Sequence, residues 1–457
     1  MSVLFQKAEA TVKLASLFEL RGTVTDVTGL VIEGTGPSVP VGSQVVIHAG
    51  NVRHAAQVVG FRRDKVLLMP FAEIQGIAPG AVITADKTST EVLVSEGLLG
   101  RTIDALGEPM DGRPLPLTGE LVPLYRNPPN AVTRTRIKDV FDLGVRAMNT
   151  FLTMGAGQRI GIMAGSGVGK STLLGMIAKH SMSDVNVIGL VGERGREVRE
   201  FIERDLGPEG MKRSVVVVAT GNEPALVRIR AAFLATAIAE YFRDKGKRVV
   251  LMLDSVTRLA MAQREVGLAI GEPPSTRGYT PSVFAMLPKL LERAGTTEGV
   301  GSITGLYTVL VEGDDMNEPI ADATRGILDG HVVLSRKLVS KGHYPAIDIL
   351  SSVSRVMSDI VTDEMRSAAN FAREMLATYQ DAEDLITIGA YKAGQNLKVD
   401  KAVALIDPLT KFLRQRADEK SSVEESWRDL AQVLASAPSP QAGAVTSAAK
   451  APQARAA

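Results

Sequence analysis

The spacing of hydrophobic positions changes along the chain and separates segments of different predicted structure. From residue 19 to 92, Gly, Pro or Asp interrupts short Val- and Ile-rich runs about every ten residues. These runs are RGTVTDVTGLVIEG, SQVVIHAG, HAAQVVGF, KVLLMPF and GAVITA. Short strands with regular turn signals are typical of a small antiparallel barrel. We therefore predict a β-barrel domain over residues 19–92.

From residue 93 to 360 the pattern changes to near-continuous apolar strands that alternate with helical segments. The strands include QRIGIMA, NVIGLV, SVVVVAT, RVVLMLD and TGLYTVLV, and residues 224–246 form the clearest helix. Strands that are apolar throughout are typical of a parallel sheet covered by helices on both faces. This segment is predicted to be an α/β core.

The remaining segments are helical or of low complexity. Residues 361–434 contain DEMRSAANFAREMLATYQDAEDL and SSVEESWRDLAQVLAS, which predict a helical C-terminal domain. Residues 1–18 suit a short amphipathic helix, which would pack on its own domain or dock on a partner. Residues 435–457 are rich in Ala, Pro and Ser and are predicted to be disordered.

Composition narrows the class of protein. The chain has 457 residues, a net charge of +1 and 4% aromatic residues, so we expect no nucleic-acid partner. The absence of cysteine excludes disulfides, thiolate catalysis and cysteine-ligated zinc, and fits a cytoplasmic setting. No apolar run is long enough to span a membrane. Lys7, Glu9 and Lys13 interrupt the apolar positions near the start, which argues against a signal-peptide core.

The strongest candidate chemistry lies in residues 158–180, where a strand, a glycine-rich loop and a helix follow one another. The loop comprises Ala164, Gly165, Ser166, Gly167, Val168, Gly169, Lys170, Ser171 and Thr172. This is the phosphate-binding spacing, with Ala164 in place of the first glycine. The glycines let backbone N–H groups surround phosphate oxygens. We expect Lys170 to bridge the β- and γ-phosphates of ATP and Ser171 to ligate Mg²⁺.

Two carboxylates extend this prediction. Asp254 ends the apolar strand KRVVLMLD, where a carboxylate can hold Mg²⁺ through water. Glu193 follows the strand NVIGLV and could orient the attacking water. Its position alone equally allows a surface charge beside Arg194 and Arg196.

Longer stretches resemble a known superfamily. GERGREV, YPAIDILSSVSRVM and the segment from LDSVTRLAMAQ to LPKLLERAG are similar to the catalytic subunits of rotary ATP synthases. Residues 345–354 fit that superfamily's signature at every position, and the similarity covers residues 20–430. VTGLVIEGTGPSVPVGS and GLLGRTIDALGEPMDG resemble the type III secretion ATPases, and AGSGVGKST resembles their flagellar-export members.

The resemblance implies roles for particular residues. It makes Glu193 the general base and lets Arg194 help to hold the γ-phosphate. It places Tyr344 against adenine. Arg355 becomes an arginine finger that acts on the nucleotide of a neighbouring subunit. Because one chain then carries both halves of a site, the resemblance implies a homohexamer.

The implied function is ATP hydrolysis that energises or primes flagellar protein export, by releasing chaperones and unfolding substrates. The implied partners are a regulatory stalk-like protein near Leu4, Phe5 and Val12, a central stalk-like protein and the membrane-embedded export gate. The protein would associate peripherally with the inner membrane.

Several alternatives are open. An injectisome ATPase differs little in sequence. A rotary synthase subunit is disfavoured because residues 381–402 contain no acidic block. An RNA translocase is disfavoured by the few aromatics in the barrel, Phe61 and Phe71. A non-catalytic nucleotide-binding subunit is disfavoured by Glu193.

Overall fold

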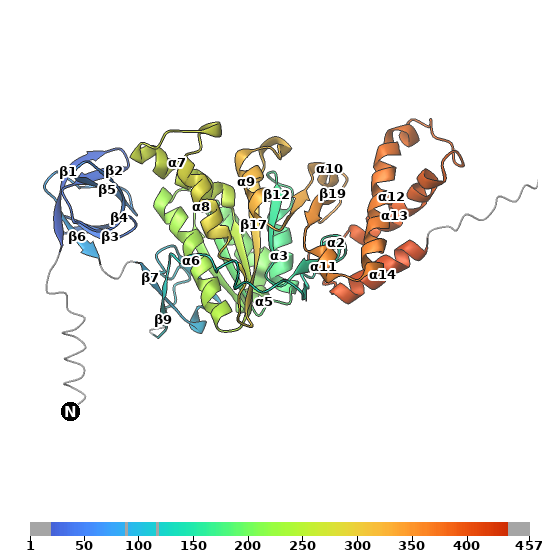
Figure 1. Cartoon of the computed structure of the whole chain (residues 1–457), viewed down its shortest axis with the longest axis horizontal. Helices are drawn as coiled ribbons and strands as arrows, with labels where there is room; N and C mark the ends of the chain where they lie inside the picture. Colours follow the sequence, from blue (N-terminus) through green and yellow to red (C-terminus); the bar gives the residue numbers. More distant parts are fainter. Residues whose placement is uncertain (1–19, 87–89, 116–117, 437–457) are drawn as a thin grey trace, which may run out of the picture.

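The computed structural model describes residues 20–86, 90–115 and 118–436. Three parts follow one another along its length: a barrel, a central sheet covered by helices, and a helical end (Figure 1). This confirms the predicted fold class. The expected helix over residues 1–18, with Leu4, Phe5 and Val12, and nearly all of the expected tail lie outside the described residues.

The barrel closes in the strand order β1-β2-β5-β4-β3-β6. Its strands are β1 (Arg21–Thr28), β2 (Val31–Gly34), β3 (Gln44–Ala49), β4 (Val52–Arg62), β5 (Lys65–Pro70) and β6 (Val82–Asp86). Alternate β-branched and aliphatic side chains, such as Val45 and Ile47, fill its interior. Phe71 is buried and Phe61 is exposed, so the described barrel presents no aromatic stacking platform.

The central sheet runs β19-β18-β12-β17-β15-β13-β14-β8, and a short strand β16 (Gly295–Thr296) pairs with β17. The strands are β8 (Arg101–Asp104), β12 (Arg159–Ala164), β13 (Val185–Val191), β14 (Ser214–Ala219), β15 (Arg248–Asp254), β17 (Ser302–Leu310), β18 (Gly330–Leu334) and β19 (Ile347–Ser354). The strands from β18 to β8 are parallel. The edge strand β19 is antiparallel, because residues 335–346 return the chain to the end of β18, where Leu334 pairs with Ile347.

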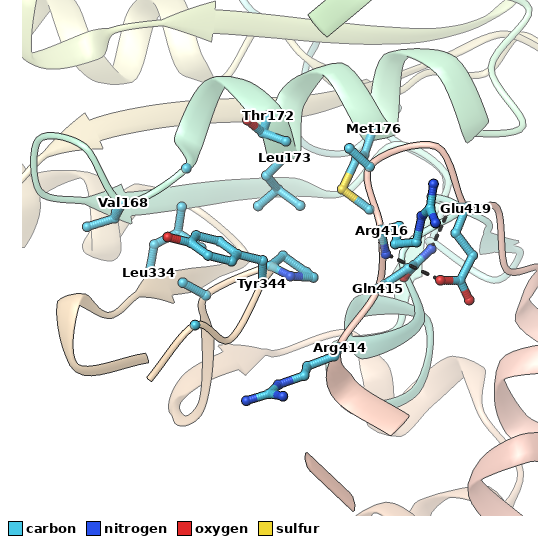
Figure 2. A pocket seen from close by; sticks show the side chains of 15 residues that line it. Val168, Thr172, Leu173, Met176, Leu334, Tyr344, Arg414, Gln415, Arg416 and Glu419 are labelled. Atoms are coloured by element: carbon cyan, nitrogen blue, oxygen red, sulfur yellow. Dashed lines mark hydrogen bonds between the residues drawn. The ribbon is translucent and has the colours of Figure 1, made fainter. Parts of the chain in front are cut away.

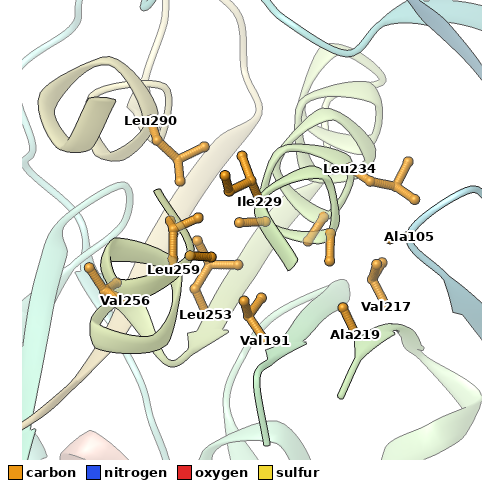
Figure 3. Packing of buried hydrophobic residues seen from close by; sticks show 14 of the residues in the cluster. Ala105, Val191, Val217, Ala219, Ile229, Leu234, Leu253, Val256, Leu259 and Leu290 are labelled. Atoms are coloured by element: carbon orange, nitrogen blue, oxygen red, sulfur yellow. The ribbon is translucent and has the colours of Figure 1, made fainter. Parts of the chain in front are cut away.

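Side chains alternate between the two faces of this sheet, and each face has its own buried cluster. Val187 and Leu251 pack under α6 (Ala225–Asp244), α7 (Val256–Ile270) and α8 (Pro281–Leu291), as Figure 3 shows for their neighbours. The next residues in sequence, such as Ile188 and Met252, pack on the opposite face against α3 (Lys170–His180) and α2 (Arg146–Phe151). Burial on both faces explains the continuous apolar runs.

Shorter elements connect these layers. They are β7 (Glu91–Val94) with β9 (Glu120–Pro123), β10 (Val140–Phe141) with β11 (Met154–Gly155), α4 (Gly195–Glu200), the π-helical turn η2 (Phe201–Leu206), α5 (Gly207–Lys212), α9 (Pro319–Ile327), α10 (Arg336–Ser340) and α11 (Met357–Ile360). Three-residue 3-10 turns are η1 (Glu96–Leu98), η3 (Thr276–Gly278) and η4 (Glu312–Asp314).

The helical end consists of α12 (Asp363–Thr387), α13 (Leu397–Leu413) and α14 (Val423–Ala435). Side-chain caps start all three helices: Thr362, Asn396 and Ser422 accept hydrogen bonds from the first turn. Small and aliphatic residues on their inner faces join the core cluster around α3. Among the described residues, no helix is both long and apolar enough to cross a membrane.

Candidate active site

The phosphate loop connects the buried strand β12 to the first turn of α3. Ala164 is the last residue of β12 and pairs with Leu310 and Leu334 on its two sides. It therefore keeps strand geometry, and a glycine is not required there. Gly167 and Gly169 have φ values of 76° and 93°, which other residues rarely adopt. The loop thus needs glycine at these two positions and tolerates alanine at its start.

The other loop residues lie around the same turn. Gly165 is buried, and a Cβ there would lie 2.8 Å from Nη2 of Arg336. Ser166 is exposed at the loop tip. Ser171 and Thr172 are half-buried in the first turn of α3, where backbone N–H groups and the helix dipole favour an anion.

Lys170, Glu193 and Asp254 meet beside this loop. Lys170 starts α3, Glu193 follows β13, and Asp254 ends β15, two strands away from β12 in the sheet. The Nζ atom of Lys170 donates to Oδ1 of Asp254 and lies 3.4 Å from Oε1 of Glu193. Thus the carboxyl ends of neighbouring strands gather three residues that are far apart in sequence.

Burial and charge tune these groups against one another. Burial alone would lower the pKa of Lys170, but attraction by Asp254 and Glu193 outweighs it, so this pKa is raised. Burial raises the pKa of Glu193 to about 7. Attraction by Lys170 opposes this rise, and repulsion from Asp254 adds to it. The second Asp254 contact comes from Thr308, whose hydroxyl donates to Oδ1 at 2.7 Å. Glu193 is therefore the carboxylate suited to exchange a proton near neutral pH.

Arg258, in the first turn of α7, is a cation of this site that the sequence reasoning missed. Its stem packs against Gly192, where a Cβ would lie 2.7 Å from that of Arg258. Its Nε atom is buried and has no hydrogen-bond partner among the described residues. Arg146, Arg159 and Arg325 also have a buried nitrogen of this kind among the described residues, so it is the place of Arg258 next to the Glu193 loop that makes it a candidate. The signal for Arg258 in the sequence was its position four residues after Asp254, in the first turn of the helix that follows this strand.

A cavity of about 360 Å³ lies beside the phosphate loop (Figure 2). Val168, Thr172 and Leu173 form one side, and Tyr344 lies with its ring beside Val168 and Leu334. The Tyr344 ring is half exposed, which leaves a face available for stacking. The apolar lining and its position next to the phosphate loop suit a nucleoside base.

Residues 414–417 and Glu419, after α13, form the far wall of this cavity, and the sequence reasoning did not identify them. Gln415 holds this wall in place. Its backbone N–H donates to the Tyr344 carbonyl at 2.9 Å, and its Nε2 donates to the Gly144 carbonyl at 2.8 Å. The Arg146 N–H donates to its Oε1 at 2.7 Å. The helical end thereby completes the base pocket.

Two predicted arginines do not join this cluster within the chain. The Arg194 side chain is 83% exposed and pairs with Glu197 at 3.6 Å. Arg355 follows β19 and is exposed, and its Nη2 donates to the Arg325 carbonyl at 3.1 Å. Neither has a hydrogen bond or ion pair with Lys170, Glu193 or Asp254 among the described contacts. The structure therefore places Arg194 and Arg355 outside the Lys170, Glu193 and Asp254 cluster of their own chain.

Comparison with known proteins decides the family. Residues 24–85 and 144–354 match the beta-barrel and nucleotide-binding domains of the ATP synthase alpha/beta family. Residues 361–432 match the T3SS EscN ATPase C-terminal domain. The flagellum-specific ATP synthase of Bacillus subtilis is 56% identical over 91% of this chain and 95% of its own length. This chain belongs to the flagellar and type III secretion ATPases of the ATP synthase alpha/beta family.

Other members of this ATPase family are similar to the chain over nearly its whole length. The flagellum-specific ATP synthase of Salmonella typhimurium is 48% identical over 92% of this chain and 95% of its own length. The type 3 secretion system ATPase of Xanthomonas euvesicatoria is 48% identical over 90% of this chain and 93% of its own length. The assembled ATPase EscN of enteropathogenic Escherichia coli has 45% identity and a TM-score of 0.86, covering 90% of this chain and all of that chain. The predicted family resemblance is confirmed.

The oxygen donors of the site fit a magnesium ion that is bound together with phosphates. Ser171 supplies a hydroxyl and Asp254 a carboxylate, both hard oxygen ligands. The described residues contain no cluster of three or more His, Cys, Asp or Glu side chains that could hold a metal alone. Mg²⁺ is commonly held by one or two protein oxygens, water and substrate phosphates, so this donor set suits it.

Proposed function

We propose that this chain is the ATP-hydrolysing subunit of a homo-oligomeric ring that energises or primes protein export through a flagellar type III secretion apparatus. One observation carries the catalytic part of this proposal. Lys170, Glu193 and Asp254 converge at the phosphate loop of one chain, while Arg355 of the same chain faces outward. A ring of identical subunits, six in number, would bring the two halves together.

In this proposal the loop N–H groups, Lys170 and the first turn of α3 hold the phosphates of ATP. Lys170 shifts from its two carboxylates to the β- and γ-phosphate oxygens, which supply the negative charge that pairs with it. Bound Mg²⁺, next to Ser171 and Asp254, would neutralise part of the phosphate charge. Once Lys170 has moved, Glu193 is free to accept a proton from the attacking water.

The arginines stabilise the charge that develops on the γ-phosphate. Arg258 already lies beside Glu193 with an unpaired donor. Arg194, at the start of α4, needs only to exchange its contact with Glu197 for the phosphate. Arg355 of the adjacent subunit would act as an arginine finger, which is typically worth about 10³–10⁵ in rate. Tyr344 would stack on adenine.

The coupling to export involves partners outside this chain. EscN has been solved in complex with its central stalk EscO, and we propose a corresponding central stalk-like protein here. A regulatory stalk-like protein would bind near Leu4, Phe5 and Val12. The ring would sit at the cytoplasmic face of the inner membrane, beneath the export gate, where it releases chaperones and unfolds export substrates.

The export function is tested in cells that carry Glu193→Gln in place of the native chain. The amide keeps the shape of the side chain and cannot accept the proton. We expect normal protein levels with strongly reduced secretion of flagellar filament protein, while secretion of injectisome effectors is unchanged. Loss of effector secretion with intact flagella would instead assign the chain to an injectisome, whose ATPases are also among its relatives. Unchanged secretion of both would refute an export role for hydrolysis.

A further inference from the structure

Helix α6 carries three buried or half-buried arginines, and one of them lacks a carboxylate partner. Arg228 pairs with Glu265 at 2.6 Å, and Arg243 pairs with Asp244 at 2.8 Å. Arg230 lies between them in sequence and is only 5% exposed, yet it forms no ion pair among the described residues. A buried guanidinium without a counter-charge is costly, so its surroundings should explain it.

The contacts of Arg230 satisfy only one side of its guanidinium. Nε donates to the Ala105 carbonyl at 3.0 Å, and the group lies over the Phe71 ring at 5.9 Å. Burial lowers the pKa of Arg230, and interactions with Tyr125 and then Asp104 oppose this lowering without cancelling it. The Asp104 carboxylate is already occupied, since it accepts the N–H groups of Leu106 and Glu108 at 2.8 Å each. The terminal amino groups of Arg230 make no hydrogen bond to a described residue, and they are not fully buried.

Arg230 is one of the residues that line a cavity of about 270 Å³. The cavity lies between β7, the turn after β8 and α6, and it shares no residue with the base pocket beside the phosphate loop. Figure 3 shows Leu234, which lines this cavity, near Ala105, whose carbonyl accepts the Arg230 hydrogen bond. Aliphatic side chains, from Val92, Leu98, Leu234 and Ile238, form part of its wall, and polar groups form the rest.

We infer that this cavity binds a small carboxylate with an apolar tail. Arg230 offers two terminal N–H donors in the geometry that a carboxylate accepts as a pair, and Ser95 adds a hydroxyl to the wall. The aliphatic side chains of the wall would cover the tail. Glu91 and Glu108, exposed residues of the same lining, repel any anion, and a dianion about twice as strongly as a monoanion. Their charge therefore favours monocarboxylates over doubly charged phosphates.

Two sources could supply this carboxylate: a free amphipathic acid, or an acidic residue beside apolar neighbours on a second copy of this chain. Leu93 and Leu106 at the mouth are 49% and 44% exposed, so either source would meet apolar surface there. Both sources place a carboxylate on the Arg230 guanidinium. In either case, removing the positive charge of Arg230 should weaken binding of the carboxylate.

The test uses hexanoate as the probe and calorimetric titration of the full chain as the readout. We expect hexanoate to bind wild type at least about tenfold more tightly than hexan-1-ol or inorganic phosphate. Arg230→Met should reduce hexanoate affinity about tenfold or more. Ser95→Leu, which fills the cavity and leaves Arg230 in place, should do the same. Arg228→Met removes an arginine from the same helix outside the cavity and should leave hexanoate affinity unchanged.

Sedimentation velocity separates the two sources. If hexanoate or Arg230→Met weakens self-association, a second copy supplies the carboxylate; if hexanoate binds and self-association is unchanged, the ligand is a free acid. Equal affinity for hexanoate and hexan-1-ol, or equal hexanoate affinity in wild type and Arg230→Met, would overturn the inference. So would no binding of hexanoate together with unchanged self-association in Arg230→Met, which would mean that Arg230 is merely hydrated.

Discussion

At the scale of single residues, one ammonium group is shared by two carboxylates. Lys170 contacts Asp254 directly and Glu193 at 3.4 Å, and all three side chains are mostly buried. Three buried charges with a net charge of −1 favour a structure in which one carboxyl takes up a proton. Glu193 holds the longer contact and has the raised pKa. The site is thus prepared for proton transfer before substrate arrives.

The first prediction concerns Glu193→Gln in the purified protein. The substitution removes the proton acceptor and leaves the Lys170–Asp254 contact, so ATP should still bind. We expect kcat to fall by about 10²–10⁴, the usual worth of a positioned general base. Glu203→Gln, in η2, serves as the matched control, because this exposed carboxylate pairs with Arg199 and does not act on Glu193; it should retain most activity. Near-wild-type turnover of Glu193→Gln would remove Glu193 from the base role.

The second prediction concerns pH. A base with a pKa of about 7 is active only when deprotonated, so kcat/KM should rise with pH up to about 7 and then level off. The same shift affects stability. Because the folded chain holds this proton more tightly than the unfolded chain, the wild type should lose stability relative to Glu193→Gln as pH rises from about 4.5 to about 7. A flat kcat/KM profile across neutral pH would contradict this account.

Residues inside a local motif could be predicted from sequence, and residues placed by tertiary contacts could not. The phosphate loop and Asp254 stand at the ends of recognisable strands, so their meeting follows from sheet topology. Arg258 enters the site only because Gly192 leaves room for its stem. Gln415 reaches the base pocket from a domain more than two hundred residues away in sequence, through bonds to Gly144 and Arg146. No local pattern encodes such contacts.

At the scale of elements, the packing of α3 against the turn η2 fixes the helix that carries Lys170. Gly175, in the middle of α3, lies so close to η2 that a Cβ there would be 2.5 Å from the Asp205 carbonyl oxygen. This neighbour is backbone, which cannot rotate away as a flexible side chain would. The close approach links the phosphate helix to the segment that follows Glu193.

The third prediction uses this contact. Gly175→Ala should lower the free energy of unfolding by about 1–3 kcal/mol, the usual cost of overpacking, as measured by denaturant titration. Gly326→Ala, near the end of α9, is the matched control because a Cβ there meets no atom within 4 Å. In that helix alanine should be neutral or stabilising by up to about 1 kcal/mol. Equal stability of the two variants would show that α3 can move away from η2 freely.

The long, regular elements of the fold could also be predicted from sequence. All five named core strands and the long helix α6 are present, because each is an uninterrupted run with one periodicity. The edge strands β8 and β19 were not identified, and neither was β18, an inner strand of five residues. β8 is only four residues long, and β19 alternates buried and exposed residues over part of its length. Edge strands are covered on fewer sides, so their apolar signal is weaker.

At the scale of the whole molecule, the proposed catalytic residues and the proposed arginine finger lie on different parts of one chain. Lys170 and Glu193 lie at the centre of the sheet, and Arg355 follows the edge strand β19. A closed ring of identical chains turns this separation into complete sites between neighbours. The solved EscN ATPase, similar over 90% of this chain, was described as assembled.

The fourth prediction follows from this separation. If each site needs two chains, specific ATPase activity should rise steeply with protein concentration and parallel the formation of oligomers. Activity and sedimentation velocity measured across the same dilution series provide the check. A constant specific activity in samples that contain only monomer would show that one chain suffices.

The most direct test of a shared active site mixes two inactive variants. Lys170→Ala lacks phosphate binding but keeps its own Arg355, and Arg355→Ala lacks the finger but keeps its own phosphate loop. Each variant alone should be inactive. Random co-assembly of equal amounts should restore about a quarter of the wild-type interfaces, and ATPase activity with them. If the mixture co-assembles and stays as inactive as its components, Arg355 does not act across the interface and the ring account is wrong.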